Sequence, residues 1–573
     1  MLLGYAFTAA YIVLLGWLIV CAYLSRRWIS GLFRGKIDRI TITLAIAVMA
    51  FFVIFSLLYV HPVEQLYFDE NIYQGIALNI LHSGNALWCQ YGTAYASSCG
   101  LGTVYHDPVE LSFYLAIAFA IFGIGTNVAY GLELAIGAVS ILLVFLLASA
   151  MFGKRAGIAS AIAFALIPEL FIWSRTQAVP NLLLMAFTVL AFLLYEVYRR
   201  DRNWRTMGLF LSAVGMAMYV RIEAALLIPI FFLIELPWIL DSSKDLGRFK
   251  PRRKFILGLA AFVLFVVLIT PQIYYIAYEL HSLNYGSGSL CGANDTATFS
   301  VSNFACNIKS NTAFFLGAYN STGYYPAYFA PLTTIIAVVG FVVMLLYGKR
   351  EDRHYAMVLG LWILAFHFFY DAFYAGSVTY GVDVRFMLII YPALAIFAGY
   401  AISSMSSEMP KLVPALHKLR NAWMRGIVAD VSFILIISAF AILPFYNALG
   451  TITLPTSQMP QEQLPLAAVN FIYGNYTAVP TNCLVFSFTP DIWYEHNRSA
   501  AQIGYLGSTD SNFTKFESQF SCFVIDRGYW CAVSPYNTGE CPQDMSNYNV
   551  TALASTQASG STLGFYRINN YTK

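Results

Sequence analysis

Carboxylate and imidazole side chains stand at both ends of the stretch from Tyr67 to Glu110. Asp69 and Glu70 are adjacent near its start, and His106 and Asp107 are adjacent near its end. Carboxylates act as general bases in many enzymes, and carboxylates and imidazoles also hold ions. A stretch that gathers such groups at two points indicates a loop built for chemistry or for binding ions.

Asp69 also has a purely structural interpretation, because it is placed to N-cap a helix that runs to about Leu81. A cap accounts for Asp69 but for neither Glu70 nor the His106-Asp107 pair, so we favour the chemical interpretation. The apolar side chains of this helix form one stripe that could lie on the bilayer surface. The stripe consists of Ile72, Tyr73, Ile76, Ala77, Ile80 and Leu81.

Composition places the chain among membrane proteins. Of its 573 residues, 59% are hydrophobic and only 11% are charged, and the mean hydropathy is +0.63. These values are typical of an α-helical polytopic membrane protein rather than of a soluble core. We expect about twelve spans in the apolar runs Gly4–Leu24, Ile40–Val60, Val128–Met151, Gly157–Trp173, Pro180–Tyr198, Thr206–Val220, Ala224–Leu240, Phe255–Ala277, Pro326–Tyr347, Tyr355–Tyr374, Phe386–Ser404 and Ile427–Leu449.

The loops between these runs are alternately basic, and the basic loops hold most of the 33 Lys and Arg residues. By the positive-inside rule the basic loops are cytoplasmic and the other loops are external. Met1–Leu24 lacks the basic start and the cleavage site of a signal peptide, so it is expected to be a retained span with an external N-terminus. We therefore expect a multi-pass protein of the plasma membrane. The basic loops are Arg26 to Arg39, Lys154-Arg155, Arg199 to Arg205, Lys244 to Lys254, Lys349 to Arg353 and Lys411 to Arg425.

One further apolar run, Leu111–Phe122, does not fit this alternation. About 12 residues are too few to span a bilayer comfortably. A crossing there would also place the basic Lys154-Arg155 loop outside. We therefore expect a membrane-lying or re-entrant helix at Leu111–Gly123, inside an external catalytic loop of residues 61–127.

Two kinds of residue mark the loops that the charge rule makes external. Triplets for N-glycosylation begin at Asn294, Asn320, Asn475, Asn497, Asn512, Asn549 and Asn570. All cysteines except Cys21 also fall there, which favours disulfides in an oxidising compartment, although free thiols are the alternative. Short separations favour the pairs Cys89–Cys99, Cys291–Cys306 and Cys531–Cys541, which leaves Cys483–Cys522 to join strands of the C-terminal domain.

After the last span the chain becomes rich in Asn, Ser, Thr, Tyr and Pro. Leu464–Tyr473 has a helical pattern, and Cys483–Phe488, Cys522–Ile525 and Thr562–Ile568 have strand patterns. We therefore divide the chain into a transmembrane domain, residues 1–450, and a small external α/β domain, residues 451–573.

Arg175, Arg221 and Arg385 lie at the external ends of spans. Cations at that depth are costly, so they are candidates for function. A planar guanidinium binds phosphate oxygens in a bidentate manner, which makes phosphate the natural ligand. The structural alternative is snorkelling or a local ion pair, for which Glu223 is close to Arg221 and Asp383 is close to Arg385 in sequence. We favour this alternative for Arg175 and Arg221 and phosphate for Arg385.

Carboxylates in an external loop and arginines at the bilayer boundary suggest a membrane-embedded phosphate leaving group and an acceptor deprotonated by a carboxylate. Phe68-Asp69-Glu70 resembles the Asp-Glu motif of the C-type (GT-C) glycosyltransferases, which use lipid-phosphate sugars. This family includes protein O-mannosyltransferases and the aminoarabinose transferases of lipid A. His106 to Leu111 is similar to its His-Pro-Pro-Leu segment. Ile167 to Arg175 resembles its Pro-to-Ser-Arg span end, and Val384 to Leu394 its late Arg-aromatic span.

The resemblance covers roughly Tyr67 to Tyr400 and has departures. Pro180-Asn181 stands where many relatives carry Asp, which puts a second-carboxylate metal site in doubt. Glu133 stands where relatives often have Arg. The Trp-Trp-Asp-Tyr-Gly motif of oligosaccharyltransferases is absent, and Asp491-Ile492-Trp493-Tyr494 imitates it poorly, which lowers the case for transfer of a whole oligosaccharide to Asn.

The resemblance implies an inverting transfer of a hexose or mannose-like sugar from a polyprenyl- or dolichyl-phosphate donor to an acceptor hydroxyl. Asp69, with Glu70 beside it, would be the catalytic base. Arg385 would hold the donor phosphate, with His106, Asp107, Arg175 and Arg221 as further candidates for substrate binding. The acceptor is a lipid-linked, glycan or protein hydroxyl, membrane lipids surround the chain, and a divalent metal ion is left open.

No nucleotide-binding motif is present, so neither a nucleotide-sugar donor nor nucleic acid is expected as a ligand. His367 and Asp371, four residues apart in one span, favour an intrahelical contact over a proton relay. The rival classes are an ion-coupled transporter and a catalytically inactive assembly partner. A transporter predicts interrupted helices near the midplane and inverted repeats, neither of which is clear in the sequence.

Overall fold

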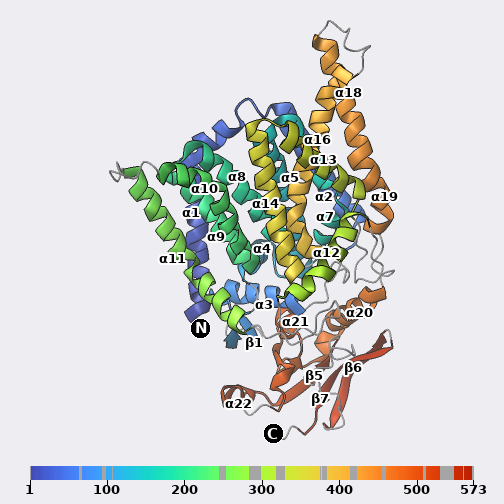
Figure 1. Ribbon diagram of the computed structural model, residues 1–573. Helices are drawn as coiled ribbons and strands as arrows, with labels where there is room; N and C mark the ends of the chain where they lie inside the picture. Colours follow the sequence, from blue (N-terminus) through green and yellow to red (C-terminus); the bar gives the residue numbers. More distant parts are fainter. Residues whose placement is uncertain are drawn as a thin grey trace.

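The structure, a computed structural model, describes residues 2–62, 68–92, 99–105, 108–176, 179–243, 253–282, 299–317, 329–373, 376, 384–412, 422–453, 460–507, 511–528, 548–558 and 560–570. A helical bundle is built from α1 (Leu2–Phe33), α2 (Arg39–Tyr59), α3 (Phe68–Ser83), α4 (Glu110–Phe122), α5 (Thr126–Phe152), α6 (Lys154–Ala165), α7 (Pro168–Trp173), α8 (Pro180–Asp201), α9 (Trp204–Val220), α10 (Leu227–Ser243), α11 (Arg253–Ser282), α12 (Val301–Phe315), α13 (Pro331–Tyr347), α14 (Arg350–Ala372), α15 (Val384–Met387), α16 (Tyr391–Leu412), α18 (Ala422–Ile437) and α19 (Leu443–Ile452) (Figure 1). Short 3-10 helices, η1 (Ile222–Leu226) and η4 (Leu388–Ile390), and a π-helical segment, η5 (Ser438–Ile442), join some of them.

Every apolar run expected to cross the membrane contains helix. Among the described residues, eight helices are long and apolar enough to span a bilayer, so the chain is a multi-pass membrane protein and the count of twelve stays a prediction. The expected helix Gly157–Trp173 is in fact two helices, α6 and α7. The break comes directly before Pro168, because the ring of a proline disfavours helical backbone in the residue that precedes it.

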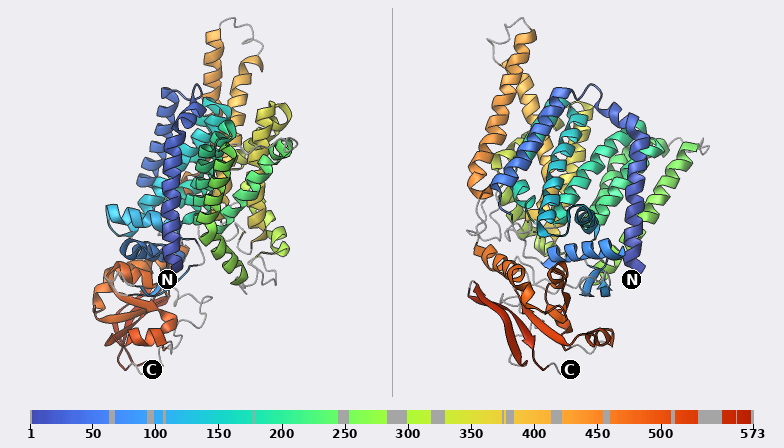
Figure 2. Two further views of the ribbon diagram at one scale, coloured as in Figure 1. Left: turned by 90° about the vertical axis from the view of Figure 1, so that its left-hand side faces the viewer. Right: turned by 180° about the vertical axis from the view of Figure 1, so that it is seen from behind.

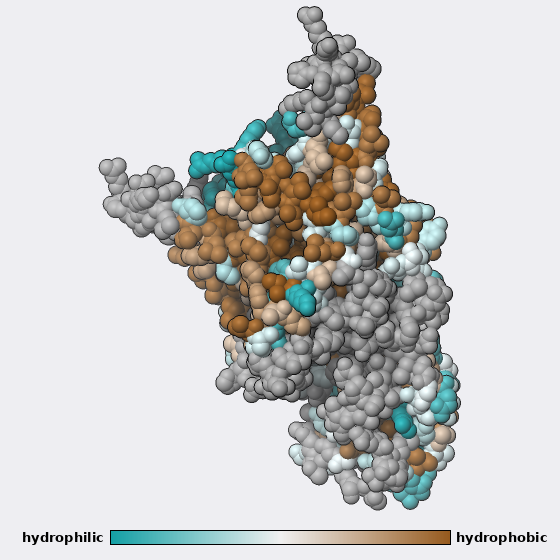
Figure 3. Space-filling view, turned by 45° about the vertical axis from the view of Figure 1, so that its right-hand side comes forward, coloured by the Kyte–Doolittle hydropathy of each residue, from teal (hydrophilic) through white to brown (hydrophobic). Residues whose placement is uncertain are grey.

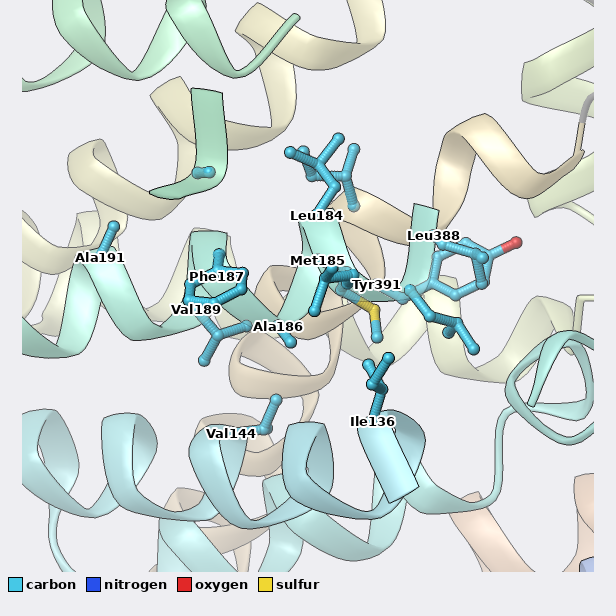
Figure 4. Packing of buried hydrophobic residues seen from close by; sticks show 14 of the residues in the cluster. Ile136, Val144, Leu184, Met185, Ala186, Phe187, Val189, Ala191, Leu388 and Tyr391 are labelled. Atoms are coloured by element: carbon cyan, nitrogen blue, oxygen red, sulfur yellow. The ribbon is translucent and has the colours of Figure 1, made fainter. Parts of the chain in front are cut away.

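The centre of the bundle is formed by α5, α8 and the segment from α15 to α16. In these three spans 72%, 89% and 83% of the most apolar window is buried, against 22% in both α1 and α2. Figure 4 shows Ile136 and Val144 of α5 on the side that faces α8, with Leu388 and Tyr391 beside Met185 of α8. The peripheral helices instead expose apolar side chains, which form the brown surface of Figure 3, as expected where lipid is the solvent.

Polar contacts hold the basic loops together at one end of the bundle. Lys154 pairs with Asp38 at 2.6 Å, and the guanidinium of Arg200 donates to the carbonyl of Ala150 at 3.2 Å. The C-terminal domain and the N-terminus of α1 both lie at the opposite end (Figures 1 and 2). The separation of basic loops from the C-terminal domain therefore agrees with the two-sided arrangement expected from charge.

The C-terminal domain contains α20 (Pro460–Asn475), α21 (Pro490–Glu495) and α22 (Ser511–Glu517), with short 3-10 helices at Tyr476–Ala478 (η7) and Ile503–Tyr505 (η8). Its sheet has the order β2-β1-β4-β3-β5-β7-β6. The strands are β1 (Trp88–Gly92), β2 (Cys99–Thr103), β3 (Cys483–Ser487), β4 (Ser499–Gln502), β5 (Cys522–Arg527), β6 (Val550–Ala558) and β7 (Ser561–Ile568). The expected strands are confirmed as β3, β5 and β7, and β3 is parallel to both β4 and β5.

Strands β1 and β2 come from the loop of residues 61–127, not from the C-terminal stretch. Tyr91 pairs with Ala501 and Gly92 with Ala500, so β1 extends the sheet antiparallel to β4. The loop and the C-terminal domain thus share one sheet, which composition did not indicate.

Helix α3 lies between the bundle and the C-terminal domain (Figure 2). Residues 72 to 79 are all buried, so the apolar stripe expected on the bilayer surface packs against protein instead. An apolar stripe indicates only that apolar groups must cover it, and does not say whether lipid or protein supplies them. Here α4 packs against α3, and the Ser112 hydroxyl donates to the Tyr73 carbonyl at 2.9 Å. Helix α4 matches the short helix expected at Leu111–Gly123.

Candidate functional site

Two arginines from distant parts of the chain meet at the ring of Phe386. Arg221 follows α9 and precedes η1, whereas Arg385 lies in α15. Their guanidinium carbons stand 5.4 Å and 5.1 Å from the ring centroid, within the range of cation–π attraction. Both side chains are only partly exposed. The structure therefore brings together two of the three arginines that the sequence singled out.

Glu223 and Tyr370 complete this cluster. The guanidinium of Arg221 donates to the buried Glu223 carboxylate, and the Tyr370 hydroxyl donates to the same oxygen at 2.7 Å. The Tyr370 ring also stacks on Phe386 at a centroid distance of 5.1 Å. The ion pair that the sequence favoured for Arg221 is thus present. Among the described residues of this cluster, two guanidinium groups stand beside one carboxylate, and this excess of positive charge suits an anion such as a phosphate.

A ladder of asparagines fixes the end of α14, from which Tyr370 projects. Asn303, Asn307 and Asn311 recur every four residues on α12, and all three are buried. The Asn307 amide donates to the carbonyl of Phe373 at 2.7 Å, and the Asn303 amide donates to that of Ala372 at 3.3 Å. The last carbonyls of a helix have no partner within it, so these amides take the role of a cap.

The third of these asparagines, Asn311, contacts the buried carboxylate of Asp371. The Asn311 amide donates to Oδ1 of Asp371 at 2.8 Å, while His367 Nδ1 stands 2.9 Å from Oδ2. The His367–Asp371 pair is therefore the intrahelical contact that the sequence favoured. With Asn311 it anchors α12 to α14.

The carboxylate end of the candidate site is built on α3. This helix begins at Phe68, so Asp69 is its second residue and lies two positions past the N-cap, rather than at the N-cap as expected. Glu70 is buried, whereas the side chain of Asp69 and the residues His106 and Asp107 lie outside the described part of the chain. Their place relative to Arg385 stays a prediction.

Arg175 makes different contacts from the other two arginines. Its Nε donates to the carbonyl of Val60 at 3.4 Å, and its guanidinium stands 6.0 Å from the ring of Tyr130. These contacts tie the end of α7 to α2 and α5. They are structural contacts with a distant backbone carbonyl and a ring, and the role of Arg175 stays a prediction.

Buried carboxylates in the apolar helices are the residues that sequence reasoning used least. Glu110 accepts from the Tyr11 hydroxyl at 3.1 Å, Glu133 accepts from the Val179 amide at 2.8 Å, and Glu169 accepts from the Trp173 indole at 3.2 Å. An acid inside an apolar run is itself a signal, because such a charge is costly to bury. Within the described part of the chain, His, Cys, Asp and Glu side chains form no group of three that could hold a metal ion.

The structure describes some of the cysteines and glycosylation triplets that the sequence analysis assigned to external loops. Cys483 and Cys522 form a disulfide between β3 and β5, as expected, and Cys89 and Cys306 are each disulfide-bonded. The side chains of the other external cysteines lie outside the description, so the remaining pairings stay predictions. These cysteines are Cys99, Cys291, Cys531 and Cys541. Asn497, Asn549 and Asn570 are exposed in the C-terminal domain and Asn475 is half-buried. The Asn512 side chain, Asn294 and Asn320 lie outside the description.

Residues 106–275 match the family described as dolichyl-phosphate-mannose-protein mannosyltransferase. ArnT from Cupriavidus metallidurans, bound to undecaprenyl phosphate, aligns with a TM-score of 0.52 at 14% identity, over 92% of this chain and 97% of that one. AglB from Archaeoglobus fulgidus, in complex with an inhibitory peptide and a dolichol-phosphate, aligns with a TM-score of 0.50 at 12% identity, over 93% of this chain and 74% of that one. No curated protein sequence matches significantly.

At such low identities the two structures establish a shared fold. The chain has the fold of the GT-C glycosyltransferases, and the family match over residues 106–275 points to the same class of enzyme. The resemblance drawn from the Asp-Glu motif and the arginines is confirmed at this level.

Proposed function

We propose that the protein is a GT-C glycosyltransferase that moves a hexose, such as mannose, from a dolichyl- or polyprenyl-phosphate donor to an acceptor hydroxyl. The observation that supports this most strongly is the cluster of Arg221 and Arg385 at Phe386, with Glu223 as counter-charge. The two structural neighbours are complexes with lipid phosphates, undecaprenyl phosphate in one and dolichol-phosphate in the other. The matched family description names a protein acceptor, so we infer a protein hydroxyl.

The reaction is a single displacement. Asp69 takes the proton of the acceptor hydroxyl while that oxygen attacks the anomeric carbon of the sugar. The bond between this carbon and the phosphate oxygen breaks at the same time, and the lipid phosphate leaves with the bonding electrons. Because the attack comes from the face opposite the leaving group, the anomeric configuration inverts.

The arginines act on the leaving group. Negative charge on the lipid phosphate grows as the sugar departs, so a fixed cation stabilises the transition state more than the ground state. Arg385, which the family resemblance assigns to the donor phosphate, is the principal partner, and Arg221, which pairs with Glu223, is the second. We further infer that the reaction takes place on the external face of the plasma membrane, where the disulfides and glycosylation triplets of the C-terminal domain would lie.

The test compares Asp69→Asn with Arg385→Ala in purified, correctly inserted protein. Asp69→Asn removes the base and keeps the shape, so dolichyl phosphate should bind normally while turnover falls by about 10²–10⁴-fold. Arg385→Ala should weaken binding and turnover together.

Two substitutions far from the cluster serve as controls. Asp430→Asn removes an exposed carboxylate that pairs with Arg155, and Arg27→Ala removes an exposed cation. Neither should change binding or turnover. Native turnover in Asp69→Asn would remove the base from the mechanism and favour a carrier or an inactive assembly partner.

A further inference from the structure

Asp491 of α21 occupies the space that Gly75 of α3 leaves empty. A side-chain carbon at position 75 would overlap the Asp491 carboxyl group and stand 2.9 Å from its Cβ. The Asp491 side chain is completely buried. The C-terminal domain thus reaches α3 less than two turns after Asp69 and Glu70 (Figure 1).

A cluster of three aromatic side chains connects Asp491 to the part of the 61–127 loop that precedes His106. The Trp88 indole nitrogen donates to Oδ2 of Asp491 at 3.3 Å. The Trp88 ring meets Tyr105 edge-to-face at 5.6 Å, and Tyr105 meets Tyr73 of α3 at 5.8 Å. Tyr105 directly precedes His106, and Tyr73 lies one turn after Asp69. Both ends of the loop that carries the candidate chemistry therefore contact the Trp88–Tyr105–Tyr73 cluster.

The surroundings of this contact allow little movement. Strand β1, which begins with Trp88, pairs with β4 of the C-terminal domain. Nearby, the hydroxyls of Thr126 in α5 and Tyr473 in α20 are hydrogen-bonded at 2.7 Å. A shift of the C-terminal domain relative to the helical bundle would break these bonds as well as the contact with Gly75.

Burial of the Asp491 carboxyl group lowers the stability of the fold, which a purely structural contact would not require. Its Oδ1 finds no hydrogen-bond partner among the described residues, and a buried polar atom without a partner costs roughly 1–3 kcal/mol. Burial, through loss of hydration, raises the pKa of this carboxyl group well above its ordinary value. An apolar side chain of similar size would avoid both costs.

We propose that Asp491 is a positioning residue for sugar transfer, an inference that rests on the proposed function. Its carboxyl group seats α3 through Gly75 and holds the Trp88–Tyr105–Tyr73 cluster through the indole hydrogen bond. In this way the C-terminal domain holds α3, which carries Asp69 and Glu70, in a fixed position against Tyr105. The domain thereby contributes to turnover without contacting the donor phosphate.

A double-substitution cycle on the full-length protein tests the contact. Gly75→Ala places a methyl group against Asp491 and should lower turnover by about 10- to 100-fold, since displacements near 1 Å have effects of that size. Asp491→Gly should lower it similarly. Together they should be no worse than Asp491→Gly alone, because the methyl group then has nothing to displace. Binding of dolichyl phosphate should be unchanged in all three.

Two further substitutions separate positioning from mere stabilisation. Asp491→Asn keeps the shape and can still accept the Trp88 hydrogen bond, so turnover should return to within a few-fold of native. Gly131→Ala, at an exposed helical glycine with open space around it, should have no effect. Turnover is expressed per folded molecule. The proposal would be overturned if turnover fell only in proportion to the folded fraction. It would also be overturned if the effects of Gly75→Ala and Asp491→Gly on turnover were additive.

Amide hydrogen exchange in α3 provides a readout that does not need catalysis. Exchange across residues 68–83 should be faster in Gly75→Ala and Asp491→Gly than in the native chain or Asp491→Asn. If the native protein transfers no sugar, the proposed function fails, while unaltered α3 exchange in the variants would overturn the positioning role itself.

Discussion

At the scale of single residues, Glu223 sets the charge of the arginine cluster. It is 3% exposed and accepts hydrogen bonds from both Arg221 and Tyr370. A buried ion pair gains little net stability, because desolvation of the two ions offsets their attraction. Its presence beside Arg385 is better explained by function, since the carboxylate moderates the positive charge that meets the phosphate and orients the guanidinium of Arg221.

Glu223→Gln should therefore change stability and affinity in opposite directions. Loss of one partner of a buried pair lowers the free energy of unfolding by roughly 3 kcal/mol. The more positive cluster should bind dolichyl phosphate more tightly, by about tenfold or 1.4 kcal/mol. Thermal unfolding with and without dolichyl phosphate measures both effects.

Tyr370→Phe is the matched control, because it removes one hydrogen bond to Glu223 and leaves the charge in place. It should cost about 1 kcal/mol and leave affinity nearly unchanged. Weaker binding of dolichyl phosphate to Glu223→Gln than to the native protein would argue against a phosphate at this cluster.

At the scale of elements, helices were predictable where apolar runs were long, because the bilayer dictates their length. The packing partner of α3 was not predictable, because its apolar stripe requires contact with apolar groups but does not specify whether lipid or protein provides them. The asparagines of α12 recur every four residues in the sequence, yet their partners at the end of α14 lie 60 or more residues away. Arg221 and Arg385 were chosen individually, and only the fold shows that they share Phe386.

The strands of the C-terminal domain enclose a carboxyl group whose titration can be followed. Burial raises the pKa of Asp526 to about 6, although hydrogen bonds from Trp493 and Ser487 to its Oδ2 oppose the shift. The folded protein thus holds this proton more tightly than the unfolded chain, where the pKa is near 3.9. Stability should therefore fall as the pH rises from about 4 to about 6.

Asp526→Asn should flatten that dependence. A shift of about two pKa units corresponds to roughly 3 kcal/mol of unfolding free energy across this pH window. Unfolding midpoints of the full-length protein in detergent, measured from pH 4 to pH 7, give the slope. Some slope should remain, because the pKa of Asp491 is raised as well. An unchanged slope in Asp526→Asn would show that Asp526 is not its source.

At the scale of the whole molecule, the shared sheet joins two distant parts of the chain into one assembly. The pairing of β1 with β4 joins residues more than 400 positions apart. No local pattern encodes such a pairing, because the hydrogen bonds of a sheet carry no sequence signature and β1 is short. Division of the chain at residue 450 followed the change in composition, whereas the sheet crosses that boundary.

The last prediction concerns the side of the membrane on which this assembly lies. Ser30→Cys introduces a thiol at the basic end of α1, and Ser555→Cys introduces one on the edge strand β6. Both serines are exposed, and Cys21, the one free cysteine among the described residues, is buried, so background labelling should be low. A membrane-impermeant maleimide added to intact cells should label Ser555→Cys almost completely. It should label Ser30→Cys only after the membrane is permeabilised.

This arrangement bears directly on the donor. On the expected external side, a sugar carried on a lipid phosphate can be delivered at the face where α3 and the C-terminal domain meet, whereas a cytoplasmic nucleotide sugar would have to cross the bilayer to reach it. The reverse labelling pattern would place α3 and the shared sheet in the cytoplasm. The positive-inside assignment would then be wrong, and the reason for preferring a lipid-linked donor over a nucleotide sugar would be lost, even though the fold would be unchanged.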